Sequence, residues 1–296
     1  MEGKKIVEII GGLGNQMFQY ALYLKLKKIY GDQNTYIYLG RFNDTEDNKG
    51  YQIGSYFTSC KSRVFTEDVS QYLDENLSLR SKVRRKIFGA KESFILEVDG
   101  KCKRDLSKLD TGKDYYIRGL WQSEEYFKEI GTDVRNSYSL HDELLDEKWL
   151  RLNCNIEGNK KIVSLHVRRG DYISNPKYNK ILGGVCGKNY YKLAVEYIKN
   201  KFGNNVTFMV FSDDLSWVKK EYDFLKCEMV VYPSNDTDYE DLYFMSKCDA
   251  HIIANSTFSW WGAWLGENRE KLVVAPKEWY RNKSSIDIVP SDWIRI

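Results

Sequence analysis

Residues 166–172 read HVRRGDY, and they directly follow the apolar run Ile162-Val163-Ser164-Leu165. This run predicts a buried strand, and the strand ends in a histidine, two adjacent arginines and an aspartate. A guanidinium binds phosphate through paired hydrogen bonds, and ligands of open α/β sheets collect at the carboxyl ends of the strands. A solvated turn with surface salt bridges is the alternative that the stretch alone leaves open.

The second half of the chain alternates strand and helix patterns, which indicates a parallel sheet with helices on both of its faces. Strands are predicted at residues 161–167, 205–214, 228–232, 250–256 and 271–276. Helices are predicted between them at residues 189–203, 215–226, 238–249 and 257–266.

The first half opens with a strand at 5–10, the loop GGLGNQ, a helix at 17–31 and a strand at 36–39, as in a Rossmann-like unit. A further strand at 115–120 precedes WQSEEYF, where Ser123 suits a helix N-cap. Residues 41–110 are polar and irregular, and we expect loops and helices there that form part of a ligand-binding surface. Arg84-Arg85-Lys86 is interpreted as a solvated helix face. The predicted domains are residues 1–157 and 158–296.

The composition excludes several classes of protein. A net charge of +3 does not favour nucleic acid or anionic lipid as a partner. The six cysteines form no CxxC pair and no His/Cys cluster, which argues against a zinc site and a disulfide framework and fits a reducing compartment. No signal-peptide region and no run of about 18 apolar residues is present, so a cytoplasmic protein is expected. Peripheral contact with the inner membrane stays open.

The loop GGLGNQ at 11–16 is not a dinucleotide fingerprint, because Met17 stands where the third glycine would be. Its glycines let the backbone approach a ligand closely, and Asn15 and Gln16 would then present their amides at the start of the helix. A tight structural turn is the other interpretation.

Two more strand ends carry polar groups. VFSDD at 210–214 offers Asp213 and Asp214, which suit a nucleobase, a ribose or a metal, although Asp214 also suits a helix cap. NSTFSWWGAWL at 255–265 offers hydroxyls at a helix N-terminus, an anion cradle without lysine. The tryptophans of this motif are expected in the core. Together the strand ends predict a nucleoside diphosphate site, with the glycine loop closing over its far end.

GGLGNQMFQYA, HVRRGDY, FSDD and NSTFSWWGAWL, in this order, resemble the motifs of bacterial α-1,2-fucosyltransferases of glycosyltransferase family 11. HxRRxD alone also occurs in α-1,6- and protein O-fucosyltransferases. The resemblance implies an α/β fold of GT-B type, with two Rossmann-like domains facing across a cleft. It implies transfer of L-fucose from GDP-β-L-fucose to the 2-hydroxyl of a terminal galactose, with inversion and without a required metal or other cofactor.

The resemblance also assigns roles to positions of this chain. It implies that Arg168 holds the β-phosphate and that His166 lies against the nucleotide. The other implied donor-binding residues are Gly14, Asn15, Asp213 or Asp214 at the guanine, and Ser256, Thr257 and Ser259 at the phosphates. Gln16, Trp121 and Gln122 are expected on the acceptor side.

The catalytic group is expected to be Arg168, Asp171 and His166. Arg168 would stabilise the charge on the leaving phosphate. Asp171 is the first candidate for the general base, unless it only orients an arginine, and His166 is the second. A dissociative reaction without a strong base, and a second-shell or paired role for Arg169, stay open. An α-1,6- or protein-O-fucosyltransferase and a non-catalytic nucleotide-sugar or glycan-binding module are the alternative functions.

Overall fold

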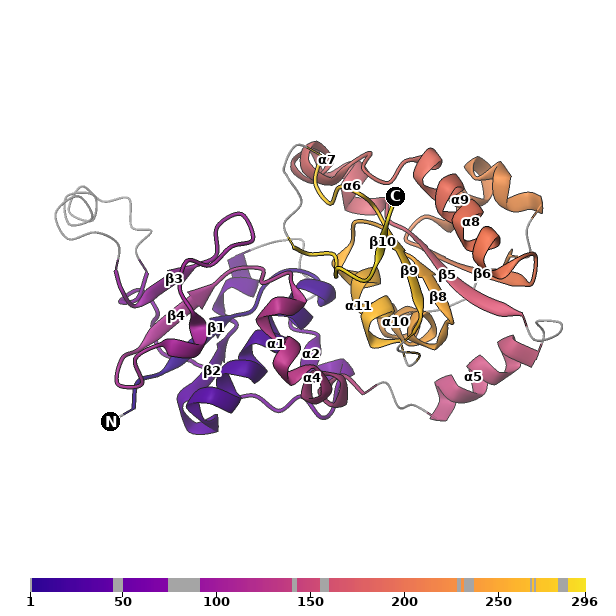
Figure 1. Cartoon of the computed structure of the whole chain (residues 1–296). Helices are drawn as coiled ribbons and strands as arrows, with labels where there is room; N and C mark the ends of the chain where they lie inside the picture. Colours follow the sequence, from indigo (N-terminus) through magenta and orange to yellow (C-terminus); the bar gives the residue numbers. More distant parts are fainter. Residues whose placement is uncertain are drawn as a thin grey trace. The chain divides into compact units, whose positions relative to one another are not determined.

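The computed structural model describes residues 2–44, 50–73, 91–139, 143–154, 160–227, 230–231, 237–266, 268, 270–281 and 287–296. They form two compact units, Met1–Ser139 and Leu140–Ile296 (Figure 1). Each unit holds one parallel sheet, which confirms the α/β fold class with two Rossmann-like units. None of the helices in the described ranges has the length and apolar character that a membrane span needs.

The second unit is a doubly wound sheet with the strand order β10-β9-β8-β5-β6-β7. All its neighbouring strands run parallel, and the strand order is that of a Rossmann fold. The order reverses between β5 and β8, so their carboxyl ends flank the switch point where such sheets bind ligands. The strands are β5 (Lys161–Val167), β6 (Val206–Ser212), β7 (Val230–Val231), β8 (Ala250–Ile252), β9 (Leu272–Ala275) and β10 (Ile294–Arg295).

Alternating side chains of β5 bury both faces of this sheet. Val163 and Leu165 pack into one core with α8 and α9, and Ile162 packs into another with α5 and α10 (Figure 1). In α11, Trp260 is fully buried and stacks on Trp264, as expected for core tryptophans. The helices are α5 (Glu143–Cys154), α6 (Gly170–Ser174), α7 (Pro176–Leu182), α8 (Lys188–Phe202), α9 (Leu215–Glu221), α10 (Asp238–Lys247) and α11 (Thr257–Leu265).

The first unit has the parallel strand order β2-β1-β4-β3, and its switch point lies between β1 and β4. Helix α1 packs against β1 and β2. Ile6 and Tyr116 pack with Phe65 and Tyr72 in a separate core. The elements are β1 (Lys5–Glu8), α1 (Leu13–Tyr30), β2 (Thr35–Tyr38), α2 (Ile53–Tyr56), β3 (Phe94–Leu96), β4 (Tyr115–Arg118) and α4 (Gly131–Ser137).

Several elements differ from the sequence prediction. The two units divide after Ser139, before α5 rather than at 157/158, because Leu145 of this helix joins a core of the second unit. Strand β3 lies in the segment expected to hold only loops and helices. WQSEEYF forms a 3₁₀ turn, Glu124–Tyr126, in which Ser123 is the N-cap and accepts from the backbone N–H of Glu125. The basic run at 84–86 lies outside the described residues.

Two buried histidines lie on the second sheet. His251 is fully buried, and its Nδ1 lies 2.8 Å from Oγ of Ser164 on the neighbouring strand. Burial, with a smaller contribution from the charge of Lys271, lowers the pKa of His251 to about 3. Burial and the charge of Arg168 likewise lower the pKa of His166 to about 3. Both imidazoles are therefore neutral in the folded protein near pH 7.

These histidines predict that the fold weakens in mild acid. The unfolded chain takes up their protons below about pH 6.5, whereas the folded chain does not until about pH 3. The free energy of unfolding should fall between these values by up to about 1.4 kcal/mol per pH unit for each histidine. Asn in His251→Asn keeps a polar atom near the position of Nδ1 but does not titrate. The slope of its free energy of unfolding against pH should therefore be smaller than that of wild type by the contribution of about one proton. Urea unfolding at pH 5, 6 and 7 measures this, and equal slopes for variant and wild type would refute the assignment.

Candidate active site

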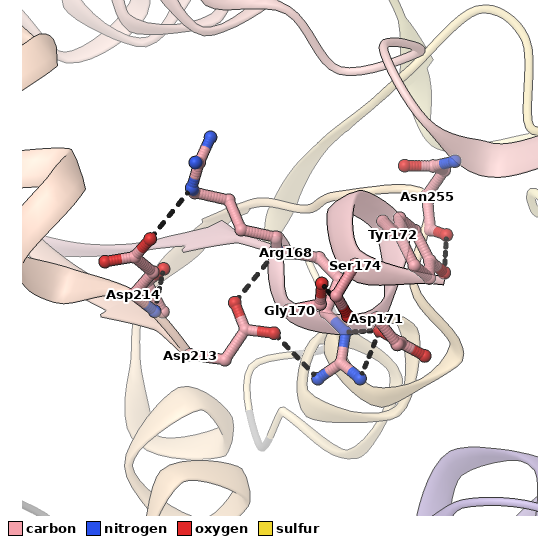
Figure 2. Close-up of polar contacts among 10 residues, drawn as sticks. Arg168, Gly170, Asp171, Tyr172, Ser174, Asp213, Asp214 and Asn255 are labelled. Atoms are coloured by element: carbon pink, nitrogen blue, oxygen red, sulfur yellow. Dashed lines mark hydrogen bonds and ion pairs between the residues drawn. The ribbon is translucent and has the colours of Figure 1, made fainter. Parts of the chain in front are cut away.

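The candidate site lies where β5 and β8 end, at the switch point of the second sheet. A hydrogen bond of 2.8 Å from the hydroxyl of Tyr172 to the carbonyl of Asn255 joins the segments that follow the two strands (Figure 2). The amide of Asn255 donates to the carbonyls of Leu182 and Trp279, both at 3.1 Å. Asn255 therefore fixes the backbone of the site, and both N–H groups of its side-chain amide are used in these hydrogen bonds.

Arg168 is the central cation of the site, and two carboxylates hold it. Its Nε and Nη2 donate to Oδ1 of Asp171 at 3.0 and 2.8 Å, and its Nη1 lies 3.3 Å from Oδ2 of Asp213 (Figure 2). Burial opposes the charge of Arg168, but the two carboxylates outweigh it and raise the pKa of the guanidinium above its usual value. A guanidinium has five N–H donors, so both terminal nitrogens keep an N–H for an oxyanion.

Asp213 also fixes the turn that carries Arg168. Its Oδ1 accepts the backbone N–H of Arg169 at 2.8 Å. A Cβ at position 170 would lie 2.6 Å from Oδ2 of Asp213, so Gly170 leaves the space that the carboxylate occupies. The aspartate expected at the guanine is thus, in this structure, a partner of the arginine turn.

Arg169 points to another partner. Its Nε donates to Oδ2 of Asp214 at 3.1 Å, and its guanidinium lies 3.5 Å from the ring centre of Trp217. Asp214 is also the N-cap of α9 and accepts from the backbone N–H of Trp217 at 3.1 Å. The helix-cap interpretation of Asp214 is correct, and the open question about Arg169 is answered in favour of pairing with an acid.

His166 is the last but one residue of β5, and its ring lies 5.9 Å from that of Phe258 in α11. Its backbone carbonyl accepts from the hydroxyl of Tyr191 at 2.9 Å. Within the described part of the chain, its buried Nδ1 has no hydrogen-bond partner. A neutral imidazole with a pKa of about 3 is a weak base.

The start of α11 supplies hydroxyls and backbone donors. Ser256 is the N-cap, and its side chain makes no cap hydrogen bond. Thr257 is half-buried, whereas Ser259 is buried and its hydroxyl donates to the carbonyl of Ser256. Ser256 and Thr257 are therefore better placed for a ligand than Ser259.

The glycine loop belongs to the switch point of the first unit. Gly11 has φ +81°, and Gly12 is the exposed N-cap of α1. Asn15 accepts at Oδ1 from Nε2 of Gln122, which follows β4, at 2.8 Å. This half-buried amide pair bridges the ends of β1 and β4. Gly14 is buried inside the first turn of α1.

The other two residues expected on the acceptor side are buried. Gln16 donates to the carbonyls of Gly11 and Gly50 and accepts from the backbone N–H of Gln52, all at 2.8 Å. Trp121 is 0% exposed, and its ring packs edge-on against that of Tyr126 within the first unit. Gln16 and Trp121 thus shape the loops, and Gln122 alone of the three expected residues keeps exposed surface.

Trp217, which lies under the guanidinium of Arg169, stands outside the motifs that the sequence analysis singled out. Tyr172 and Asn255 lie inside HVRRGDY and NSTFSWWGAWL, but their side chains act through contacts with residues distant in the chain, which a local motif does not record. The glycine of RRGD was the one available signal for the close approach of Asp213. In the described ranges, no group of three or more His, Cys, Asp and Glu side chains could hold a metal ion.

Comparison with known proteins finds a matching family model and several similar proteins. The model of the family described as Glycosyl transferase family 11 matches residues 95–296. An α-1,2-colitosyltransferase of Escherichia coli is 33% identical over 98% of this chain and 98% of its own length. The O-antigen biosynthesis glycosyltransferase WbnK of Escherichia coli is 29% identical, over 97% of this chain and 98% of that protein. Galactoside 2-alpha-L-fucosyltransferase Sec1 of Mus musculus is 28% identical over 51% of this chain and 42% of its own length.

Proposed function

Because the chain belongs to glycosyltransferase family 11, we propose that it moves L-fucose from GDP-β-L-fucose to the 2-hydroxyl of a terminal galactose with inversion. The observation that carries this proposal is the pairing of Arg168 with Asp171 and Asp213 at the switch point of a Rossmann sheet, beside the hydroxyl-bearing start of α11. Such a place suits a nucleoside diphosphate.

The proposed chemistry is electrostatic. Breaking the bond between the sugar and GDP leaves negative charge on the β-phosphate. Arg168 and the first backbone N–H groups of α11 would stabilise this charge more strongly in the transition state than in the ground state. Asp171 holds the guanidinium before the donor arrives, so little reorganisation is needed at the moment of reaction.

The proposed general base is Asp171. Its Oδ1 takes both bonds from Arg168, while its second oxygen points away from the guanidinium (Figure 2). The side chain is 38% exposed, so a sugar hydroxyl can reach this oxygen. His166 is the weaker candidate, because burial has lowered its pKa to about 3.

The donor sugar has one competing candidate, because a colitosyltransferase is 33% identical to this chain. Colitose is fucose without the 3-hydroxyl. Fucose is favoured by the four motifs and by the likeness to a galactoside fucosyltransferase. A site that hydrogen-bonds a hydroxyl rejects the analogue without it by about 10⁴–10⁵, so the two donors are readily separated.

The acceptor is proposed to be a galactose-terminated oligosaccharide, because one relative is named a galactoside fucosyltransferase and another a glycosyltransferase of O-antigen biosynthesis. Action in the cytoplasm is proposed from the scattered cysteines, which suit a reducing compartment.

A transfer assay tests the function. Purified protein is given GDP-fucose or GDP-colitose with a panel of β-galactosides, and the product is analysed by NMR. An α-fucosyl linkage to the 2-hydroxyl of galactose is expected, with GDP-fucose much the faster donor. A faster reaction with GDP-colitose would mean that colitose, not fucose, is the donor sugar. A 1,6 linkage would mean that the 6-hydroxyl, not the 2-hydroxyl, is the acceptor. GDP binding by calorimetry without transfer or donor hydrolysis would indicate a binding module.

The base is tested with Asp171→Asn, which keeps an oxygen acceptor for Arg168 but cannot take a proton at pH 7. The turnover number should fall by about 10²–10⁴, the usual contribution of a general base. Asp238→Asn, a change in the first turn of α10, is the matched control. If Asp171→Asn keeps near-normal turnover, the aspartate only orients the arginine.

A further inference from the structure

Glu97 ties the end of β4 to the edge of the first sheet. Its backbone N–H continues the β3–β4 pairing by donating to the carbonyl of Arg118 at 2.9 Å. Its side chain then turns back, and Oε2 accepts the backbone N–H groups of Leu120 and Trp121 at 2.7 and 2.8 Å. One carboxylate oxygen therefore satisfies two successive donors just beyond the strand.

The turn that Glu97 holds is unusual for its residue types. Trp121 adopts φ +54°, in the left-handed region that bulky residues rarely occupy. Its buried ring packs edge-on against Tyr126 with 5.0 Å between ring centres. A residue keeps such a backbone only where its surroundings impose it, and strain of this kind clusters at functional sites.

The approach of the carboxylate is built into the turn. A Cβ at position 119 would lie 2.5 Å from Cβ and 2.8 Å from Oε2 of Glu97, so Gly119 makes the contact possible. From the other side, Gln19 of α1 donates to the carbonyl of Gly119 at 3.0 Å and accepts the backbone N–H of Ile10 at 2.8 Å. Glu97 and Gln19 thus fix this turn from two elements.

The turn delivers Gln122, whose amide donates to Asn15 on the glycine loop. The pair bridges the switch point between β1 and β4, which is where a sheet of this kind binds its ligand. Amides that keep partial exposure there suit the hydroxyls of a sugar, which both donate and accept hydrogen bonds.

We propose that Glu97 is a positioning residue that acts through the left-handed turn at Trp121 to hold Gln122 against Asn15, and that this amide pair binds a sugar hydroxyl. The second part rests on the proposed function. Burial raises the pKa of Glu97, while the backbone N–H groups of Trp121 and Leu120 oppose that shift. These two hydrogen bonds thus stabilise the charged form of a desolvated carboxylate.

A set of variants tests this proposal with sugar transfer and amide exchange as readouts. Glu97→Leu removes the acceptor at similar size, and kcat/KM should fall by about 10² because a shift of about 1 Å at a site costs that much. Glu97→Gln keeps an oxygen for the two backbone donors and should restore the rate to within a few-fold of wild type. Glu92→Gln, an exposed acid on the same segment, is the control that should change nothing.

Coupling separates positioning from a merely structural role. Gln122→Ala should lose as much activity as Glu97→Leu, and the double variant should lose no more than either alone. If the two losses multiply, or if Glu97→Leu lowers only the melting temperature, the proposal is wrong. Should Glu97→Leu fail to fold, Gly119→Ala crowds Glu97 and the ring of Trp121 in the same turn and must give the same loss.

A failure of the positioning proposal can be distinguished from a failure of the proposed function. The wild-type rate tests the proposed function by itself. Hydrogen exchange at the amides of Leu120 and Trp121 tests the positioning without any activity, and it should be faster in Glu97→Leu than in wild type or Glu97→Gln. Unchanged exchange would overturn the proposal even in an active enzyme.

Discussion

Arg168 held between the carboxylates of Asp171 and Asp213 is the interaction on which the second unit's site depends. The register of two parallel strands produces it: Val167 of β5 lies beside Ser212 of β6, so the residues that follow them, Arg168 and Asp213, emerge side by side. A slip of one residue would reverse every side chain and destroy the pair. A partly buried cation needs such partners, and these two still leave one N–H on each terminal nitrogen of Arg168 for a ligand.

The same device occurs at the switch point of each sheet. In the second unit, Tyr172 joins the end of β5 to the segment after β8 through the carbonyl of Asn255. In the first unit, Gln122 joins the end of β4 to the glycine loop through Asn15. Each bond crosses the place where the strand order reverses, and each fixes loops that the sheet itself leaves without ladder hydrogen bonds. A few side chains therefore fix the loops at the switch point of each sheet.

The sequence predicted the regular elements of the second unit because their signals are local. Strand β5 and helix α8 stand out as a buried apolar run and an amphipathic repeat, and the structure has them at nearly the predicted bounds. The two-residue strand β10 and the short helix α6 carry too few residues for any period to be read. The pairing of Arg168 with Asp213 joins residues far apart in the chain, so predicting it would have required the register of β5 and β6. Trp121 was expected on the acceptor side, and its burial was missed because a left-handed tryptophan cannot be foreseen from propensity.

If the charge of Arg168 stabilises the leaving phosphate, Arg168→Ala should transfer the sugar slowly even at saturating donor and acceptor. Saturation removes the effect of weaker donor binding, and circular dichroism checks that the variant is folded. We expect a turnover number lower by about 10²–10³, the usual loss for one preorganised donor at a developing charge. Near-normal turnover in the folded variant would contradict it.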